Sequence, residues 1–337
     1  MVTEQTITKL ETIFFCYVNT AINLFGFILS LLCLLIFLNK KFTGLFYNYI
    51  RSEILFGGMS LLSYAFRPFY YCKDTGINIL YISNIIHLTN RYLRSVFEMT
   101  ATLCCIISSL YFFLIIFNLE KSKYNILSKI SFKILCSILV GLSSILFLFR
   151  LFEFTIVPIS VNSTSTFYDN QTMITIGYMG VKSELSNTFY YKFNKIASFL
   201  ISDGILVFIL FILNIIIFIK VKKTIKTKRF MMDNASIKEN NKPASKKKLK
   251  NTENSIKFMV FVSSFNTIIG KFPLFVFYLL DTILDSNSFS IKVLINLFNF
   301  IAHTVFSLSY TINFVLYYFI NNTFRRTVNG YIKKIWK

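Results

Sequence analysis

The sequence is poor in charged residues, which occupy only 15% of its 337 positions. An ordinary soluble domain carries about 25%, so a soluble nucleic-acid-binding protein does not fit, even though the formal net charge is +21. Intrinsic disorder is excluded as well, because 55% of the residues are apolar and disordered chains are low in hydrophobicity. The remaining class is a membrane protein with basic loops.

Residues for metal, disulfide and catalytic chemistry are also scarce. The chain has two His, and its six Cys are scattered through apolar segments without metal-ligand spacing. We therefore expect no metal site and no cofactor. No Cys follows Cys136, so a disulfide framework is absent or minimal. The acidic residues are dispersed rather than gathered around one cavity, and we do not expect an enzyme.

Long apolar segments, in contrast, are abundant. A helix needs roughly 20 residues to cross about 30 Å of hydrocarbon. Segments of that length predict an all-α membrane protein, a bundle of seven transmembrane helices over 13–319, and no ten-residue alternation indicates a β-barrel. The predicted spans are 13–38, 46–71, 92–118, 132–158, 196–219, 256–280 and 291–319. The first span is interpreted as a retained helix, because the leader 1–12 lacks the basic start of a signal peptide.

The loop charges predict the orientation of the bundle. One side holds 23 Lys and Arg and a net charge of +19, and the other holds 7 and a net charge of zero. Twelve of the basic residues lie in the third loop of the basic side, 220–253. Because basic loops stay in the cytoplasm, we expect an extracellular N-terminus, a cytoplasmic C-terminus and a multi-pass protein of the plasma membrane.

Two glycosylation acceptors agree with this orientation. Asn162-Ser-Thr and Asn170-Gln-Thr both lie in the outer loop 159–195, where the modification can occur. The same loop contains the partly alternating stretch 172–181, with Gly177 and Gly180, which is typical of a hairpin. We expect that hairpin to cover a pocket.

Several short motifs resemble those of rhodopsin-like G-protein-coupled receptors. The seventh span ends in Asn313-Phe-Val-Leu-Tyr317, which resembles NPxxY, and Phe324-Arg325-Arg326 follows. The sixth span contains Gly270-Lys-Phe-Pro273 at the place of the family's kinking proline. The stretch RYLRSVFEMTATLCCIISSLYFF resembles the third helix of invertebrate FMRFamide-like neuropeptide and chemosensory receptors. The resemblance covers about residues 13–332.

The resemblance implies a receptor mechanism. An extracellular peptide or small polar or anionic ligand would bind among helices three, five, six and seven. Helix six would then swing outward about Pro273, and Asn313 and Tyr317 would rearrange to admit a heterotrimeric G protein. The tail 320–337 would form an amphipathic eighth helix that includes Arg325 and rests on the lipid bilayer.

The motifs also depart from the family pattern. The Asp-Arg-Tyr slot falls on Tyr111-Phe112-Phe113, so the switch arginine is missing, while Glu253 stands where some members place its acidic partner. The family's disulfide from helix three cannot form, because His87 occupies the helix position and 159–195 has no Cys. A receptor-fold protein that binds ligand without ordinary G-protein coupling is therefore the main alternative. A transporter or channel is a weaker one, since no internal repeat is seen.

Ionisable residues within the spans are the candidate ligand contacts. Placing a charged side chain in lipid costs free energy, so such a residue in a span usually has a functional role. Arg94 and Glu98 lie one turn apart, and an arginine there suits a carboxylate, although the pair could simply neutralise itself. A lysine in mid-membrane requires an anionic partner or water. The candidates are Arg94, Glu98, Asp203, Lys271 and His303.

Two of these residues have plain structural alternatives. Asp203 could make a helix-packing hydrogen bond, and His303 could be an interhelical donor. Arg150 and Glu153, three apart at the end of the fourth span, are interpreted as structural, with Arg150 reaching outward to the membrane surface.

Overall fold

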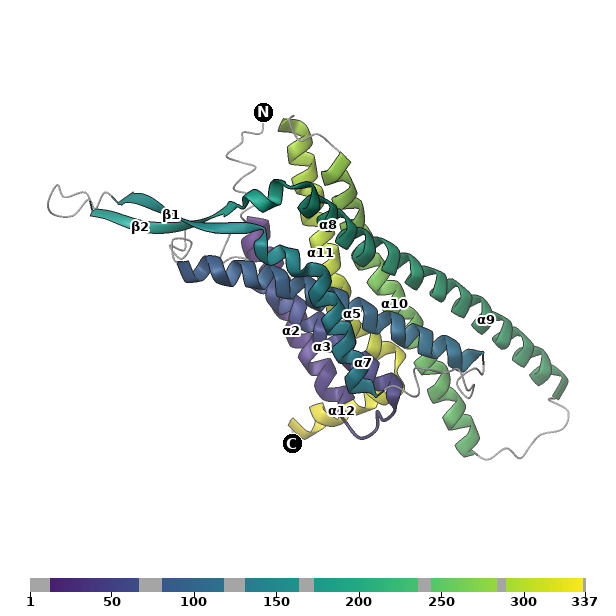
Figure 1. Ribbon diagram of the computed structural model, residues 1–337. Helices are drawn as coiled ribbons and strands as arrows, with labels where there is room; N and C mark the ends of the chain where they lie inside the picture. Colours follow the sequence, from purple (N-terminus) through teal and green to yellow (C-terminus); the bar gives the residue numbers. More distant parts are fainter. Residues whose placement is uncertain are drawn as a thin grey trace.

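The computed structural model describes residues 13–66, 81–117, 131–163, 173–235, 244–283 and 289–335. Within them the chain forms a bundle of long helices with one β-hairpin at its side (Figure 1). The main helices are α2 (Asn19–Phe37), α3 (Leu45–Ala65), α5 (Tyr81–Ile116), α7 (Phe132–Phe147), α8 (Phe189–Phe199), α9 (Leu206–Ala235), α10 (Ala244–Ile283), α11 (Phe289–Ile320) and α12 (Asn322–Ile335). The predicted seven-helix bundle is confirmed, with α8 and α9 joined into one span by the π-helical segment Leu200–Ile205.

Six helices of the described chain are long and apolar enough to cross a membrane. The second predicted span, α3, is not among them, and its packing explains why. Two thirds of its residues are buried, including Ser52, Glu53 and Ser60, because α3 lies inside the bundle between α2 and α5. A helix surrounded by other helices does not need lipid-compatible side chains on every face.

The fourth span is shorter than predicted. Helix α7 ends at Phe147, a 3₁₀ turn covers Leu148–Phe152, and strand β1 (Phe154–Ser163) follows. The prediction of helix up to residue 158 was therefore wrong. β-Branched residues favour a strand here, and Pro158 would cost a helix a backbone hydrogen bond.

The β-hairpin also differs from the prediction. Strand β2 (Met173–Lys182) pairs antiparallel with β1, from Phe154 opposite Lys182 to Ser163 opposite Met173. The predicted stretch 172–181 is thus one strand of a longer hairpin rather than a hairpin by itself. The hairpin extends sideways from the bundle (Figure 1), so it does not form the expected cover over the helices.

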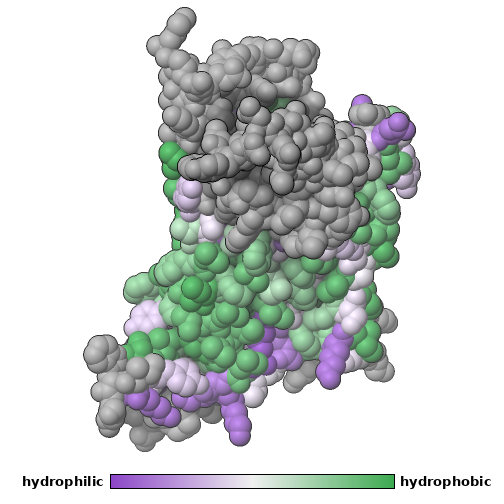
Figure 2. Space-filling view, turned by 90° about the vertical axis from the view of Figure 1, so that its left-hand side faces the viewer, coloured by the Kyte–Doolittle hydropathy of each residue, from purple (hydrophilic) through white to green (hydrophobic). Residues whose placement is uncertain are grey.

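The two ends of the bundle carry different elements. The described start of the chain and the hairpin lie toward one end, whereas α12 and the long free ends of α9 and α10 lie toward the other (Figure 1). Figure 2 shows a broad hydrophobic belt with hydrophilic residues gathered below it. At the α12 end, Arg51 donates to the carbonyl oxygens of Phe37 (2.6 Å) and Phe42 (2.5 Å). It therefore satisfies the Phe37 carbonyl, which the C-terminus of α2 leaves free, and a carbonyl of the loop that follows.

An aromatic cluster holds this same end together. Phe37 packs against Phe42, Tyr317 and Phe324 with ring centroids 5.0–5.4 Å apart. All four side chains are at most 1% exposed. The cluster anchors α12 to α2 and α11, and aromatic pairs of this geometry add about 0.5–1.5 kcal/mol each beyond their buried area.

Some sequence predictions fall outside the described residues or side chains. They are the leader 1–12, Asn170, and the side chains of His87 and Glu253. Asn162 lies in β1 opposite Ile174. Cys33, Cys104, Cys105 and Cys136 are not in disulfide bonds.

Candidate ligand-binding site

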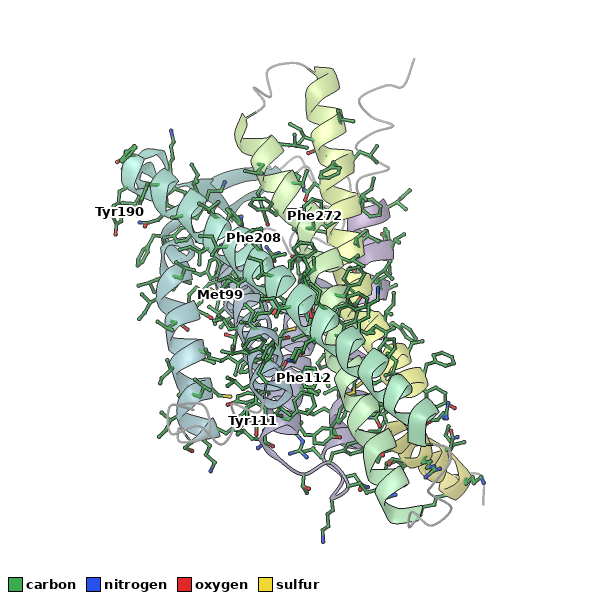
Figure 3. The ribbon with its side chains drawn as sticks, turned by 90° about the vertical axis from the view of Figure 1, so that its right-hand side faces the viewer. Met99, Tyr111, Phe112, Tyr190, Phe208 and Phe272 are labelled. Atoms are coloured by element: carbon green, nitrogen blue, oxygen red, sulfur yellow. The ribbon has the colours of Figure 1, made fainter. Side chains whose placement is uncertain are left out.

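A charged pocket lies within the bundle, toward the end opposite α12. It is narrow: the space open to a water-sized sphere is about 10 Å³, which is room for about one water molecule. Helix α5, the end of α7, the start of the fifth span and α10 contribute its walls, and Figure 3 shows Met99 on the α5 side. The lining residues are Arg94, Ser95, Glu98, Met99, Phe147, Arg150, Phe199, Ser202, Asp203, Lys271 and Tyr278.

The π-helical segment Leu200–Ile205 shapes one wall of the pocket. A π-bulge inserts an extra residue into the helix and changes the direction of the side chains, and it is frequent at functional sites. Here it places Ser202 and Asp203 in the interior, at 3% and 6% exposure. Gly204 lies against Phe275, where an added Cβ would come within 2.9 Å of the ring. The close approach to α10 therefore depends on glycine.

The strongest polar contact of the pocket joins Lys271 to Asp203. The ammonium nitrogen lies 2.6 Å from Oδ1, and the lysine side chain is 1% exposed. Ser202 donates a second hydrogen bond to Oδ2 at 3.0 Å. The anionic partner that a mid-membrane lysine requires is thus Asp203. Two of the predicted ligand residues are brought together, and each neutralises the other.

A second ion pair forms on α5. Nε of Arg94 lies 3.8 Å from Oε1 of Glu98, as their one-turn spacing predicted. Ser60 of α3 donates to the same oxygen at 3.4 Å. The Arg94 guanidinium lies over the Tyr64 ring, 4.4 Å from its centroid, which is within cation–π range.

His303 lies behind this pair rather than in the pocket wall. Its Nδ1 is 3.1 Å from the hydroxyl of Tyr64, and the imidazole is 5% exposed. The structure therefore gives His303 the interhelical hydrogen bond that was its alternative role. Through Tyr64 it remains one contact away from Arg94.

The interpretation of Arg150 was wrong. Its side chain points inward instead of reaching the membrane surface, is 6% exposed and lines the pocket. The 3₁₀ turn after α7 rotates it toward the bundle axis, between the rings of Phe147 and Phe199. Glu153 does not pair with it; that carboxylate binds Arg91 of α5 at 3.3 Å.

A polar network links three helices in the half of the bundle that contains α12. Ser263 of α10 donates to Glu53 of α3 at 3.0 Å and lies 3.2 Å from the Tyr317 hydroxyl of α11. Asn266 donates to Oδ1 of Asn313 at 2.9 Å and also to the carbonyl of Ser309. Together these contacts hold α10 against α11 on the inner side of Pro273.

Sequence reasoning missed Glu53. The sequence did indicate it, because an acidic residue within an apolar segment suggests a functional role. In the structure the Glu53 side chain is only 2% exposed. Phe112, in the slot of the missing switch arginine, is 2% exposed and belongs to a larger hydrophobic core that also contains Phe37. Hydrophobic packing therefore occupies this slot. Arg325 lies on α12 and donates to Asn322 at 2.6 Å.

Comparison with known proteins identifies one family. The family model described as "Serpentine type 7TM GPCR chemoreceptor Srw" matches residues 17–334, nearly the whole chain. No curated protein gives a significant match.

Proposed function

The chain belongs to the Srw family of serpentine seven-transmembrane GPCR chemoreceptors, and we propose that it senses an extracellular ligand in the charged pocket. The ligand is a peptide or a small polar or anionic molecule, in line with the resemblance to rhodopsin-like and FMRFamide-like receptors. The bound receptor activates a heterotrimeric G protein at the plasma membrane. As a receptor of a chemoreceptor family, it transmits a signal rather than catalysing a reaction.

One observation supports the link from ligand to signal: the buried Lys271–Asp203 pair. It joins the start of the fifth span to α10, and Lys271 lies two residues before Pro273. A proline inside a helix removes one backbone hydrogen bond and permits bending. A ligand that changes the partner of Lys271 therefore acts next to the hinge of α10.

The inner network opposes the resulting motion. An outward swing of α10 must break the contacts of Ser263 and Asn266 with α11. The ligand can drive this change only if it binds the open state better than the closed one. Because the switch arginine is missing, we assign the closed-state contacts to this network and to the packing of Phe112.

Loop charge supports the proposed orientation. The basic end of α9, the basic start of α10 and α12 lie toward one end of the bundle (Figure 1), and the pocket lies toward the other. The positive-inside rule therefore favours an extracellular pocket. We predict that Asn162→Gln and Asn170→Gln each remove one glycan from the expressed receptor. The measurement is gel mobility before and after glycosidase treatment. Asn321-Asn-Thr matches the same acceptor pattern at the α12 end, and loss of a glycan in Asn321→Gln instead would reverse the orientation.

Removal of Arg94 tests the ligand site. We expect Arg94→Gln to abolish the response to ligand, because Arg94 lines the pocket and neutral glutamine cannot replace the charged, planar guanidinium group. Surface expression is measured in parallel, because Glu98, 15% exposed, loses its cation in this variant, and the response is compared at equal amounts of receptor at the surface. The measurement is agonist-stimulated nucleotide exchange in membranes.

Arg91→Gln is the matched control, because Arg91 lies one turn earlier on α5 and pairs outside the pocket with Glu153. It should respond normally. A normal response in Arg94→Gln would refute the ligand role of Arg94.

A further inference from the structure

The charges of the pocket do not balance. Three cations line it, Arg94, Arg150 and Lys271, against two carboxylates, Glu98 and Asp203. The guanidinium group stays charged in proteins, so the wall carries one surplus positive charge. In the interior of a membrane protein, such a charge is costly unless an anion compensates it.

The surplus falls on Arg150. Its Nε has no hydrogen-bond partner within the described part of the chain, and its side chain is 94% buried. The guanidinium carbon lies 5.3 Å and 5.2 Å from the centroids of Phe147 and Phe199. These two rings hold the guanidinium in place within the pocket wall, so it is both oriented and desolvated.

The nearby carboxylates already have other partners. Asp203 accepts from Lys271 and Ser202, and Glu98 accepts from Ser60 while it pairs with Arg94. Glu153, the acid closest to Arg150 in sequence, pairs with Arg91. If one of these three carboxylates moved to pair with Arg150, the cation that it binds now would lose its partner.

We infer that the pocket binds a free carboxylate of the ligand and that Arg150 is the residue that receives it. This inference rests on the proposed function and specifies its ligand class. A carboxylate can accept two parallel hydrogen bonds from one guanidinium, which would satisfy Nε and cancel the single surplus charge. A phosphate monoester carries nearly two negative charges and would overcompensate the wall.

The pocket also limits the size and chemistry of the ligand. Its open space of about 10 Å³ is room for about one water molecule, so it suits a small polar head group such as a carboxylate, with the rest of the ligand outside. Phe147 and Phe199 flank the guanidinium and provide apolar contact for the carbon chain. An amine would add a fourth cation, and an amide would leave the charge of Arg150 uncompensated.

A binding experiment on purified full-length receptor tests the inference without any need for signalling. The probes are millimolar hexanoate and benzoate, each compared with its neutral amide, hexanamide or benzamide. The readout is the unfolding midpoint Tm. We expect the acids to raise Tm by about 2 °C or more and the amides to leave it unchanged. Arg150→Gln should abolish the acid effect, and the exposed-site control Arg326→Gln should retain it.

A second variant keeps the test decisive if Arg150→Gln does not fold. Arg150→Met retains the apolar stem and removes the surplus charge, so we expect its Tm without ligand to equal or exceed that of the wild type. A purely structural arginine would give the opposite result, a clear fall in Tm. Equal shifts by acids and amides, no shift by either acid, or an undiminished acid effect in Arg150→Gln would each overturn the inference.

Nucleotide exchange separates this inference from the proposed function. If the acids bind through Arg150 but never stimulate exchange, the carboxylate site stands and G-protein coupling fails. If exchange responds to neutral ligands and not to acids, coupling stands and the carboxylate site fails.

Discussion

Lys271→Met is expected to destabilise the receptor by about 3–5 kcal/mol, because it leaves the Asp203 carboxylate buried without its cation. The ammonium group is 2.6 Å from that carboxylate, and both side chains are at most 7% exposed. Ser202 alone, at 3.0 Å, cannot neutralise the charge. Thermal unfolding of purified receptor should show a fall in Tm of roughly 10 °C.

The double variant Lys271→Met with Asp203→Asn should recover most of that loss. Removing both charges of a buried pair is often nearly neutral, whereas removing one is not. The two effects are therefore strongly non-additive, as expected for groups in direct contact. Lys222→Met, at an exposed position of α9, is the control and should leave Tm unchanged. Additive losses in the double variant would show that the pair does not stabilise the fold.

Signalling by the double variant is informative as well. If the pair transmits ligand binding to α10, the folded double variant should bind acids through Arg150 but fail to convert binding into nucleotide exchange. A full response would mean that the signal does not depend on Lys271.

Combined substitution of Ser263 and Asn266 by alanine is expected to raise basal nucleotide exchange about tenfold. The two side chains contact Tyr317 and Asn313, respectively. Polar contacts between membrane helices are worth about 0.6–1.7 kcal/mol, and 1.4 kcal/mol corresponds to a factor of ten in population. Loss of these contacts destabilises the closed state specifically, because the outward swing of α10 breaks them anyway.

Ser137→Ala is the control, since this exposed hydroxyl on α7 binds only the carbonyl of Lys133 among the contacts of the described chain. Its basal exchange should equal that of the wild type. Unchanged basal exchange in the Ser263/Asn266 variant of a ligand-responsive receptor would contradict the closed-state role of the network. Absence of exchange in every variant, with ligand binding intact, would favour a receptor-fold protein without G-protein coupling.

Much of the fold could be predicted because it depends on local properties of the chain. Twenty apolar residues specify a membrane helix wherever they occur. The prediction failed at residues 153–158, where β-branched residues and Pro158 favour a strand. It also missed the reason for the low hydropathy of α3, whose polar residues face other helices rather than lipid.

The site was only partly predictable. Ionisable residues within apolar segments could be identified as candidates, and the Arg94–Glu98 pair followed from helix periodicity. The direction of Arg150 could not be obtained in that way, because a 3₁₀ turn after α7 determines where its side chain points. The role of Glu53 also required its partner Ser263, which lies 210 positions away.

The sequence by itself determined the class of this protein: several helices in lipid, a strongly basic set of loops on one side, and a set of ionisable groups within the apolar spans. These properties depend only on short stretches of the chain, so they can be inferred without knowledge of the tertiary contacts. Only the tertiary structure decided which charges pair. Lys271 and Asp203 are 68 positions apart, and the π-helical segment brings them together. Because pairing settles which cation is left over, only the structure distinguishes Arg150 from the other pocket cations as the carboxylate-binding residue.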